Sequence, residues 1–422
     1  MKLEVLGLFL LVVFIVFFFS GAAVRAFSDQ PELRRQSKAH QMFALRDALS
    51  RHPRSSDFYA GQVACAFNQT ATCEEKFKRV LALNSTSTVA KQAHGTLAAV
   101  ALREGRYGKA LQELDAVLAL DPHDREARSS RPVVEALSRF PDQAVQVSGD
   151  GKAAVQMDQG RVPLLINGYK ASYFFDTGAN LSVLSKSESV RFGMEIQEIT
   201  AEDASKDING NTVSYSVATA KSLVLGNIHL SNVAFLVAGD GQRPFVEVQP
   251  GQRGLIGLPV LQALGSVTWT REGLFEADRS PAPANLSVAN ICFDDLDLIA
   301  QARFDQHVLP FVLDTGAETT DLWPKFAGVA RDSIRKSGTR GFHTVTGMGG
   351  PKKFKITSLP EIALQLGGES VVLKPAHILK TRQRTLSKWF YGNLGIDLLR
   401  QAQRVTIDFR KMTLELFPPS GT

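Results

Sequence analysis

The chain contains the tetrapeptide Asp176-Thr177-Gly178-Ala179, and the same four residues recur as Asp314-Thr315-Gly316-Ala317. Each copy follows an apolar run, Tyr173-Phe174-Phe175 in the first case and Phe311-Val312-Leu313 in the second. By average amino-acid usage, a chance Asp-Thr-Gly occurs in roughly one chain in ten of this length, so a single copy would carry little weight. Two copies in the same setting indicate that a larger unit is repeated.

The residues downstream of the two motifs repeat with them. Ile256-Gly257 follows the first motif and Leu394-Gly395 follows the second, and in both cases the glycine lies 81 residues after the aspartate. Val267-Thr268 and Val405-Thr406 are separated by 138 residues, as the two motifs are. A constant offset over such a distance indicates the internal duplication of a whole domain.

Both copies contain short apolar runs typical of β-strands. In the first, Val162-Pro163-Leu164-Leu165-Ile166 is followed by Asn167-Gly168 and a second apolar run, which is a strong signal for a β-hairpin. A proline-rich break, Arg279-Ser280-Pro281-Ala282-Pro283-Ala284, separates the copies. We therefore predict two β domains, over residues 146–280 and 281–422.

The repeated residue types suit acid–base chemistry. A strand delivers an aspartate to its exposed end, glycine allows a tight turn there, and a threonine hydroxyl can brace the loop. If the copies pack about a pseudo-twofold axis, Asp176 and Asp314 adjoin and share one proton, because neighbouring like charges cannot both ionise. The ionised member can then accept a proton from an attacking water while the protonated member supports a carbonyl oxygen. The spacing does not assign either role to one aspartate.

At these residues the sequence resembles the retropepsin-like aspartic peptidases, over about residues 150–417. The resemblance implies that Asp176 and Asp314 are the catalytic dyad and that Thr177 and Thr315 brace the two loops against each other. It also implies two sets of supporting residues. The active-site loops contain Thr177, Gly178, Ala179, Thr315, Gly316 and Ala317, and the apolar-apolar-Gly elements packed beneath the turns contain Ile256, Gly257, Leu394 and Gly395.

Members of this family usually build the site by pairing two copies of a single lobe. Here both lobes lie in one chain, and a short linker favours pairing within the chain, so a monomer is expected. The family also carries a glycine-rich flap over the substrate. The second lobe offers Gly347 and Gly349, whereas the first offers only Gly210, so we expect unequal flaps. Glu318 in the second lobe is expected to place a further charge beside the dyad.

The first 26 residues predict export. An unbroken apolar run covers residues 5–19, and Val24 and Ala26 fit the small-residue pattern of a signal peptide cleaved after Ala26. The alternative is a retained membrane tether, because residues 5–24 are long enough to span a bilayer. Either reading places the rest of the chain outside the cytoplasm, as a periplasmic or secreted protein.

Residues 27–145 predict a helical domain, because between residues 38 and 140 the apolar positions recur at three- and four-residue spacing. Gly105 and Tyr107 mark a turn and Pro122 ends the next helix, in a pattern that resembles a tetratricopeptide repeat and implies a docking site for a protein partner. The alternative is an unspecialised helical bundle that packs on the next domain.

The three cysteines give no disulfide framework and no zinc-site pattern. Cys65 and Cys73 are close enough to bridge two packed helices in an oxidising compartment, and two separate buried thiols are the alternative. Cys292 is expected in a buried strand. Asp294 and its acidic neighbours lack the glycine and spacing of a calcium loop and are expected at a solvated strand entrance. We predict no metal and no cofactor.

Length and composition exclude other classes. The 422 residues suggest two or three domains at roughly 150 residues each. Hydrophobic residues make up 44% and charged residues 21%, which fits neither a disordered chain nor a multi-pass membrane protein. The net charge of +6 is spread along the chain, and its densest patches lack interleaved aromatic residues, which favours a solvated surface over a nucleic-acid site.

The sequence thus predicts a multidomain α plus all-β protein, with a helical repeat-like domain followed by two pseudo-twofold-related retropepsin-like β-barrel lobes. The expected function is that of an exported aspartic endopeptidase acting on peptide or protein substrates. The alternative is a non-catalytic peptide-binding or scaffold protein of the same fold. Intact Asp-Thr-Gly in both lobes favours the enzyme, because loss of activity would be expected to erode at least one copy.

Overall fold

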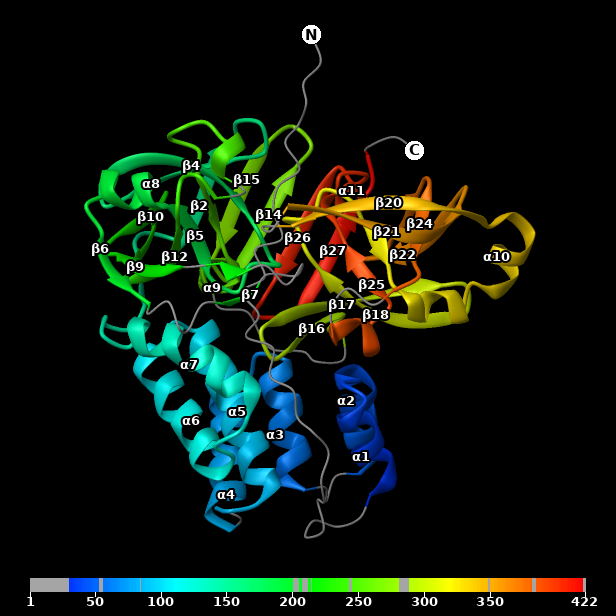
Figure 1. The fold of residues 1–422 in the computed structure, drawn as a ribbon, viewed down its shortest axis with the longest axis horizontal. Helices are drawn as coiled ribbons and strands as arrows, with labels where there is room; N and C mark the ends of the chain where they lie inside the picture. Colours follow the sequence, from blue (N-terminus) through cyan, green and yellow to red (C-terminus); the bar gives the residue numbers. More distant parts are fainter. Residues whose placement is uncertain are drawn as a thin grey trace.

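The computed structural model describes residues 30–419 except 53–55, 84, 200–204, 207–211, 214, 243–244, 281–287, 348–349 and 382–384. A helical region is followed by two β lobes that lie side by side (Figure 1). The predicted signal peptide or tether falls outside the described residues, as does most of the proline-rich break. Among the described helices, none combines the length and apolar character needed to cross a membrane.

The helical region consists of short consecutive helices. They are α1 (Pro31–Lys38), α2 (Met42–Arg51), α3 (Asp57–Ala66), α4 (Thr70–Leu83), α5 (Thr88–Arg103), α6 (Tyr107–Leu120) and α7 (Arg125–Leu137). The first of them begins before residue 38, where the apolar periodicity starts. It buries only Leu33, so its sequence carries no repeating apolar pattern. Its start is marked instead by Pro31 and Glu32 in the first turn.

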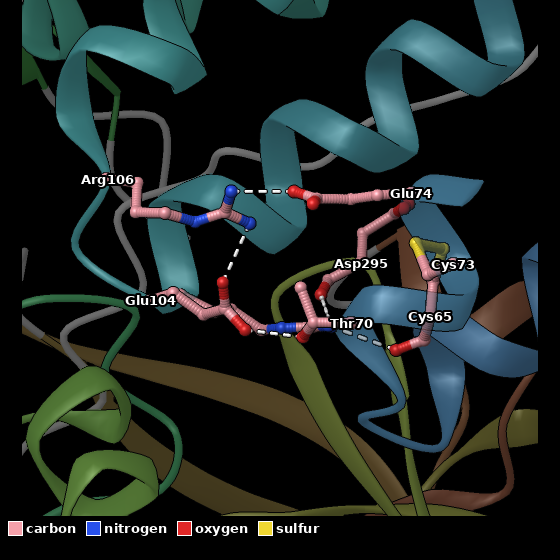
Figure 2. Close-up of a disulfide and its surroundings, with 8 residues drawn as sticks. Cys65, Thr70, Cys73, Glu74, Glu104, Arg106 and Asp295 are labelled. Atoms are coloured by element: carbon pink, nitrogen blue, oxygen red, sulfur yellow. Dashed lines mark hydrogen bonds and ion pairs between the residues drawn. A yellow bond between two sulfur atoms is a disulfide. The ribbon is translucent and has the colours of Figure 1, made fainter. Parts of the chain in front are cut away.

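A disulfide joins α3 and α4 through Cys65 and Cys73 (Figure 2). The two helices pack closely, because a Cβ atom at Gly61 would lie 2.8 Å from the ring of Phe77. Gly105, with a φ of 69°, lies in the turn between α5 and α6.

The first lobe is built on a ten-stranded sheet. Its strands, in spatial order, are β1 (Ala144–Val147), β11 (Ile228–Ser231), β10 (Leu223–Leu225), β3 (Val162–Ile166), β4 (Tyr169–Phe175), β13 (Gly254–Ile256), β5 (Ser182–Ser185), β12 (Val233–Ala238), β9 (Ser216–Ala220) and β6 (Glu195–Glu198). The predicted hairpin is confirmed, because Asn167 and Gly168 have φ values of 49° and 82° and join β3 to β4.

The second lobe is built on another ten-stranded sheet. Its strands are β20 (Thr339–Gly347), β21 (Gly350–Leu359), β24 (Ala376–Leu379), β19 (Asp321–Leu322), β25 (Gly392–Leu394), β18 (His307–Leu313), β17 (Asp297–Phe304), β22 (Ile362–Leu366) and β23 (Glu369–Leu373), with β16 (Ile291–Asp294) paired to β17. Short helices α9 (Leu258–Ala263) and α11 (Ile396–Leu399) occupy matching places in the two lobes, directly after β13 and β25.

Both lobes repeat the same three-strand arrangement around the motif. The strand before it pairs in parallel with the apolar-apolar-Gly strand, as β4 with β13 and β18 with β25. That strand pairs in antiparallel fashion with the strand after the motif, β5 or β19. The predicted fold class of helices followed by two related β lobes is therefore confirmed.

A five-stranded sheet joins the lobes, in the order β2 (Lys152–Gln156), β15 (Leu274–Asp278), β14 (Ser266–Thr270), β26 (Arg404–Asp408) and β27 (Thr413–Phe417). At its centre Thr268 lies opposite Thr406, its own duplicate, and their Oγ1 atoms are 2.9 Å apart. A residue can face its own duplicate only on the symmetry axis, so the pseudo-twofold axis passes between these two threonines.

The helical region packs against both lobes, below them in the view of Figure 1. The hydroxyl of Tyr107 donates to Asn232 O at 3.1 Å and accepts from Ala234 N at 3.1 Å, in the first lobe. Arg103 donates to Asp295 O at 2.6 Å and lies over the ring of Phe293 in the second lobe, with 3.8 Å between the guanidinium carbon and the ring centroid.

Arg103 also connects the second lobe to the disulfide. Its guanidinium donates to Cys65 O at 3.1 Å, so one side chain holds α3, α5 and the β16–β17 turn together. Cys292 is buried on β16, as predicted.

One expectation about this interface is wrong. Asp294 and Asp297 are buried rather than solvated, because the helical region covers the β16–β17 hairpin. His40 Nδ1 lies 2.9 Å from the carboxylate oxygens of Asp294. Which surface of the second lobe would be covered depends on contacts between residues about 250 positions apart, and local sequence carries no record of them.

Candidate active site

The two motif loops meet on the pseudo-twofold axis. Asp176 follows β4, and its backbone N–H donates to Ile256 O at 2.8 Å. Asp314 follows β18, and its N–H donates to Leu394 O at 2.9 Å. Each aspartate is therefore held at the end of its strand by the apolar-apolar-Gly strand beside it.

Gly257 and Gly395 lie where the structure leaves no room for a side chain. A Cβ atom at Gly257 would lie 2.5 Å from the carbonyl carbon of Leu181, and one at Gly395 would lie 2.8 Å from Ala317 O. The residues that follow them donate to the loops above, Leu258 N to Ala179 O and Ile396 N to Ala317 O, both at 2.8 Å. The structure thus places these elements beneath the turns.

Thr177 and Thr315 contact each other reciprocally across the axis. Thr177 N donates to Thr315 Oγ1 and Thr315 N donates to Thr177 Oγ1, both at 3.0 Å. Each hydroxyl then donates at 2.8 Å to the opposite strand, that of Thr177 to Leu313 O and that of Thr315 to Phe175 O. Each loop thus fixes the position of the other.

This brace brings the two carboxyl groups side by side. A Cβ atom at Gly178 would collide with the Asp314 carboxylate, and one at Gly316 would collide with that of Asp176. Both aspartate side chains have an exposed fraction of 0%. Burial, together with the negative charge of Asp314, raises the pKa of Asp176 well above its ordinary value. Two adjacent buried carboxyls of this kind hold a proton between them.

The hydrogen bonds to the two carboxyls differ. Asp176 Oδ1 accepts from Gly178 N at 2.8 Å. Asp314 Oδ1 accepts from Gly316 N at 3.1 Å and from Ala317 N at 3.0 Å. Asp314 Oδ2 also accepts a side-chain hydrogen bond at 2.9 Å, from Asn393 Nδ2.

Sequence reasoning missed Asn393. A signal for it exists: the residue 138 positions earlier is Leu255, so an alignment of the two halves would have shown a polar residue at a position that is apolar in the other half. Glu318, expected to add a charge beside the dyad, is exposed to solvent in the second loop.

The predicted flaps are only partly described. In the second lobe, β20 and β21 form a long hairpin in which Gly347 lies opposite Gly350. Figure 1 shows this hairpin extending from α10 (Arg331–Ser337) toward the first lobe. Gly349 and Gly210, the other two predicted flap residues, lie outside the described residues. In the part of the chain that the structure describes, no three His, Cys, Asp or Glu residues gather in a way that could hold a metal ion.

Comparison with known families matches residues 162–260 to the model of a family described as aspartyl protease. The matched stretch contains the first motif together with Ile256-Gly257, and it covers less than half of the chain. The first lobe is thus similar to the domain of that family over the matched residues. No curated protein matches the chain in sequence.

Many solved structures show distant similarity to the chain, and two of them serve as examples. Basic 7S globulin from soybean aligns with 62% of this chain and 93% of its own, at 12% identity and a TM-score of 0.33. A retropepsin-like aspartic protease from Rickettsia conorii aligns with 32% of this chain and 94% of its own, at 15% identity and a TM-score of 0.22.

Proposed function

We propose that this protein is an aspartic endopeptidase that hydrolyses peptide bonds with a water molecule activated by Asp176 and Asp314. The observation that carries the proposal is the pair of fully buried carboxyl groups, each packed over the glycine of the opposite loop. The match of the first lobe to an aspartyl protease family supports it.

The reaction follows from one proton shared by two carboxyls. The ionised carboxylate accepts a proton from the water as its oxygen attacks the carbonyl carbon of the substrate. The protonated carboxyl donates to the carbonyl oxygen, so no full negative charge develops there. Because Thr177 and Thr315 fix the loops against each other, the carboxyls keep their positions while the protons move.

A peptide or protein is the proposed substrate, and the β20–β21 hairpin is the proposed cover over it. Since one chain supplies both aspartates, we propose that the active species is a monomer. We also propose that the protein is exported, because the Cys65–Cys73 disulfide suits an oxidising compartment.

For the helical region we propose a role in orienting the two lobes. Tyr107, one of the residues that suggested a repeat with a docking surface, is buried against Asn232 and Ala234 of the first lobe. This contact favours packing over partner binding at that helix. Recruitment of a protein partner by other faces of the region remains a separate proposal.

The experiment compares the purified protein with Asp176→Asn and Asp314→Asn variants on a mixed peptide library between acidic and neutral pH. We expect the wild type to cleave internal peptide bonds and each variant to lose on the order of 10²- to 10⁴-fold in rate, the range for removal of a positioned acid or base. A wild type that binds library peptides without cutting them would establish the non-catalytic alternative. Wild-type turnover by either variant would exclude a shared dyad.

A further inference from the structure

The two halves of the site differ at one buried position next to the dyad. Asn393 lies on β25, has an exposed fraction of 7%, and its Nδ2 donates to Asp314 Oδ2 at 2.9 Å. The corresponding residue of the first half, 138 positions earlier, is Leu255 on β13, with an exposed fraction of 2%. A leucine side chain can offer no hydrogen bond, so Asp176 lacks the equivalent of this donor.

The carboxyl groups therefore differ in how well they are stabilised as anions. Asp314 accepts from Gly316 N, Ala317 N and Asn393 Nδ2. Asp176 accepts from Gly178 N through Oδ1, the nearby N–H group of Gly316 also favours its charged form, and its Oδ2 has no hydrogen-bond partner within the described part of the chain. Donors aimed at a carboxylate favour its charged form, and a buried carboxyl with fewer donors keeps a proton more readily.

We propose that Asn393 is a positioning residue that fixes the negative charge of the dyad on Asp314 and leaves the shared proton on Asp176. The proposal rests on the function proposed above and assigns the two roles that pseudo-symmetry leaves open. Asn393 acts through Asp314, without bonding to the substrate.

The reaction then runs in one direction through the dyad. Asp314 takes a proton from the water as the water oxygen bonds to the carbonyl carbon, and Asp176 gives its proton to the carbonyl oxygen. In the second step the C–N bond breaks. Asp314 returns its proton to the leaving nitrogen, and one hydroxyl of the tetrahedral intermediate returns a proton to Asp176. The enzyme ends with the protonation it began with, and one water has been consumed.

At acidic pH, the other titratable groups near Asn393 do not offset its effect on the charge of Asp314. Asp321 on β19 lies opposite Asn393 in the sheet. Burial and the charge of Asp397 raise the pKa of Asp321 to about 7, so below neutral pH it is protonated and adds no negative charge. His343 on the flap strand β20 has its Nε2 3.4 Å from Asp321 Oδ1, and burial lowers its pKa.

The remaining carboxylates around the second loop either have hydrogen-bond partners of their own or face the solvent. Asp397, at the start of α11, accepts from Thr320 N at 3.0 Å and from Thr320 Oγ1 at 2.7 Å. Glu318 is exposed to solvent. In the first half, Val183 takes the place of Asp321, so the polar character of this layer belongs to the second lobe.

The central test replaces Asn393 by the residue of the other half. In Asn393→Leu the charge on Asp314 loses a donor, so the acid limb of the kcat/KM profile, which reports ionisation of the dyad, is expected to move to higher pH. Loss of a hydrogen bond to a charged group corresponds to a shift of about one to two pH units. At a fixed pH on that limb, kcat/KM of Asn393→Leu should be about 10- to 100-fold below that of the wild type. At pH values above the limb, KM should be unchanged.

An exchange variant separates this role from simple packing. Leu255→Asn combined with Asn393→Leu moves the donor to Asp176, and we expect the acid limb to return toward the wild-type position with the roles of the aspartates exchanged. If Asn393 only fills space, the exchange variant would be no better than Asn393→Leu. Leu255→Val serves as the matched control, because it disturbs the same layer without touching a hydrogen bond and should leave the acid limb in place.

A titration independent of turnover keeps the proposal testable if no peptide is cleaved. The carboxyl carbons of ¹³C-labelled aspartate, assigned by signals lost in Asp176→Asn and Asp314→Asn, should show Asp314 ionising at lower pH than Asp176 in the wild type. The difference in pH between the two ionisations should be smaller in Asn393→Leu. Absence of cleavage would thus refute the proposed function alone. The assignment is overturned if Asp176 ionises first, or if Asn393→Leu leaves the order and spacing of the two titrations unchanged.

Discussion

Thr268 faces Thr406, the same residue of the other half, across the seam between β14 and β26. Thr177 and Thr315 repeat that relationship at the motif loops, where each donates to the other. These two pairs lie on one axis, which runs from the candidate active site to the sheet that joins the lobes. The geometry of the dyad therefore depends on how accurately the two halves are held together.

The threonine brace should be essential for that geometry. Thr177→Val removes the acceptor of Thr315 N–H and the donor to Leu313 O, and a buried polar group left unpaired costs about 1–3 kcal/mol. We expect this loss of stability in urea unfolding, accompanied by at least a tenfold lower kcat. Thr177→Ser keeps the hydroxyl and should retain most of both properties. Equal behaviour of the valine and serine variants would show that the hydroxyl is not what matters.

Gly257 should not tolerate even a methyl group. In Gly257→Ala the new Cβ atom meets the backbone of Leu181, which cannot move without displacing the loop of Asp176. Overpacking of this kind costs about 1–3 kcal/mol. The matched control is Gly108→Ala in α6, where a Cβ atom has no neighbour within 4 Å and alanine should stabilise the helix by about 0.5–1 kcal/mol. Thermal unfolding should therefore give a lower Tm for Gly257→Ala and a higher Tm for Gly108→Ala than for the wild type.

The contact of the helical region with the second lobe should weaken as the pH rises. Burial lowers the pKa of His40, but the charge and hydrogen bond of Asp294 outweigh it, so the pKa lies above its ordinary value of 6.5. A raised histidine pKa means that this stabilisation is complete below pH 6.5 and is lost as the pH passes through the folded-state pKa. A hydrogen bond between charged groups is worth about 1.5–3 kcal/mol, so the amides of α1 and α2 are expected to be less protected at pH 8 than at pH 6 after correction for intrinsic exchange rates.

Two variants check the origin of that pH dependence. His40→Gln should reduce the difference in protection between the two pH values, and Asp295, whose pKa burial raises to about 7, is expected to account for what is left. His307→Gln, at an exposed position in the second lobe, should keep the wild-type difference. A pH dependence as large in His40→Gln as in the wild type would show that His40 is not its source.

The disulfide should stabilise the helical region locally. It closes a loop with a sequence separation of 8, for which chain entropy gives about 2–3 kcal/mol. Reductant is therefore expected to lower the Tm of the wild type. The Cys65→Ala/Cys73→Ala variant should start at the lower Tm and show no response to reductant. Cys292→Ala retains the disulfide and should respond as the wild type does, so a response in the double variant would contradict this account.

The duplication made much of the site predictable. The offset of 138 residues shows that the Asp176 and Asp314 loops are equivalent, and equivalent loops of two paired lobes must meet at the axis. Local residue types accounted for the Asn167-Gly168 turn, because both positions need a positive φ. Features that depend on local chemistry or on exact repetition can thus be read from the sequence.

The features that escaped prediction depend on tertiary contacts between unlike segments. Asn393 matters because its amide reaches Asp314, 79 residues away, and nothing in its own neighbourhood marks that contact. Asp294 is buried because His40 and its helices cover it. The start of α1 was missed because a helix with a single buried residue has no apolar period.

The presence of both lobes in one polypeptide has a consequence for how the site can evolve. In a homodimer every substitution is made twice, so both halves of a symmetric site must accept the same residue. A fused chain is free of that restriction, and the halves can specialise one position at a time. Leu255 and Asn393 occupy equivalent positions in the two halves, and no pair of identical subunits could encode that difference.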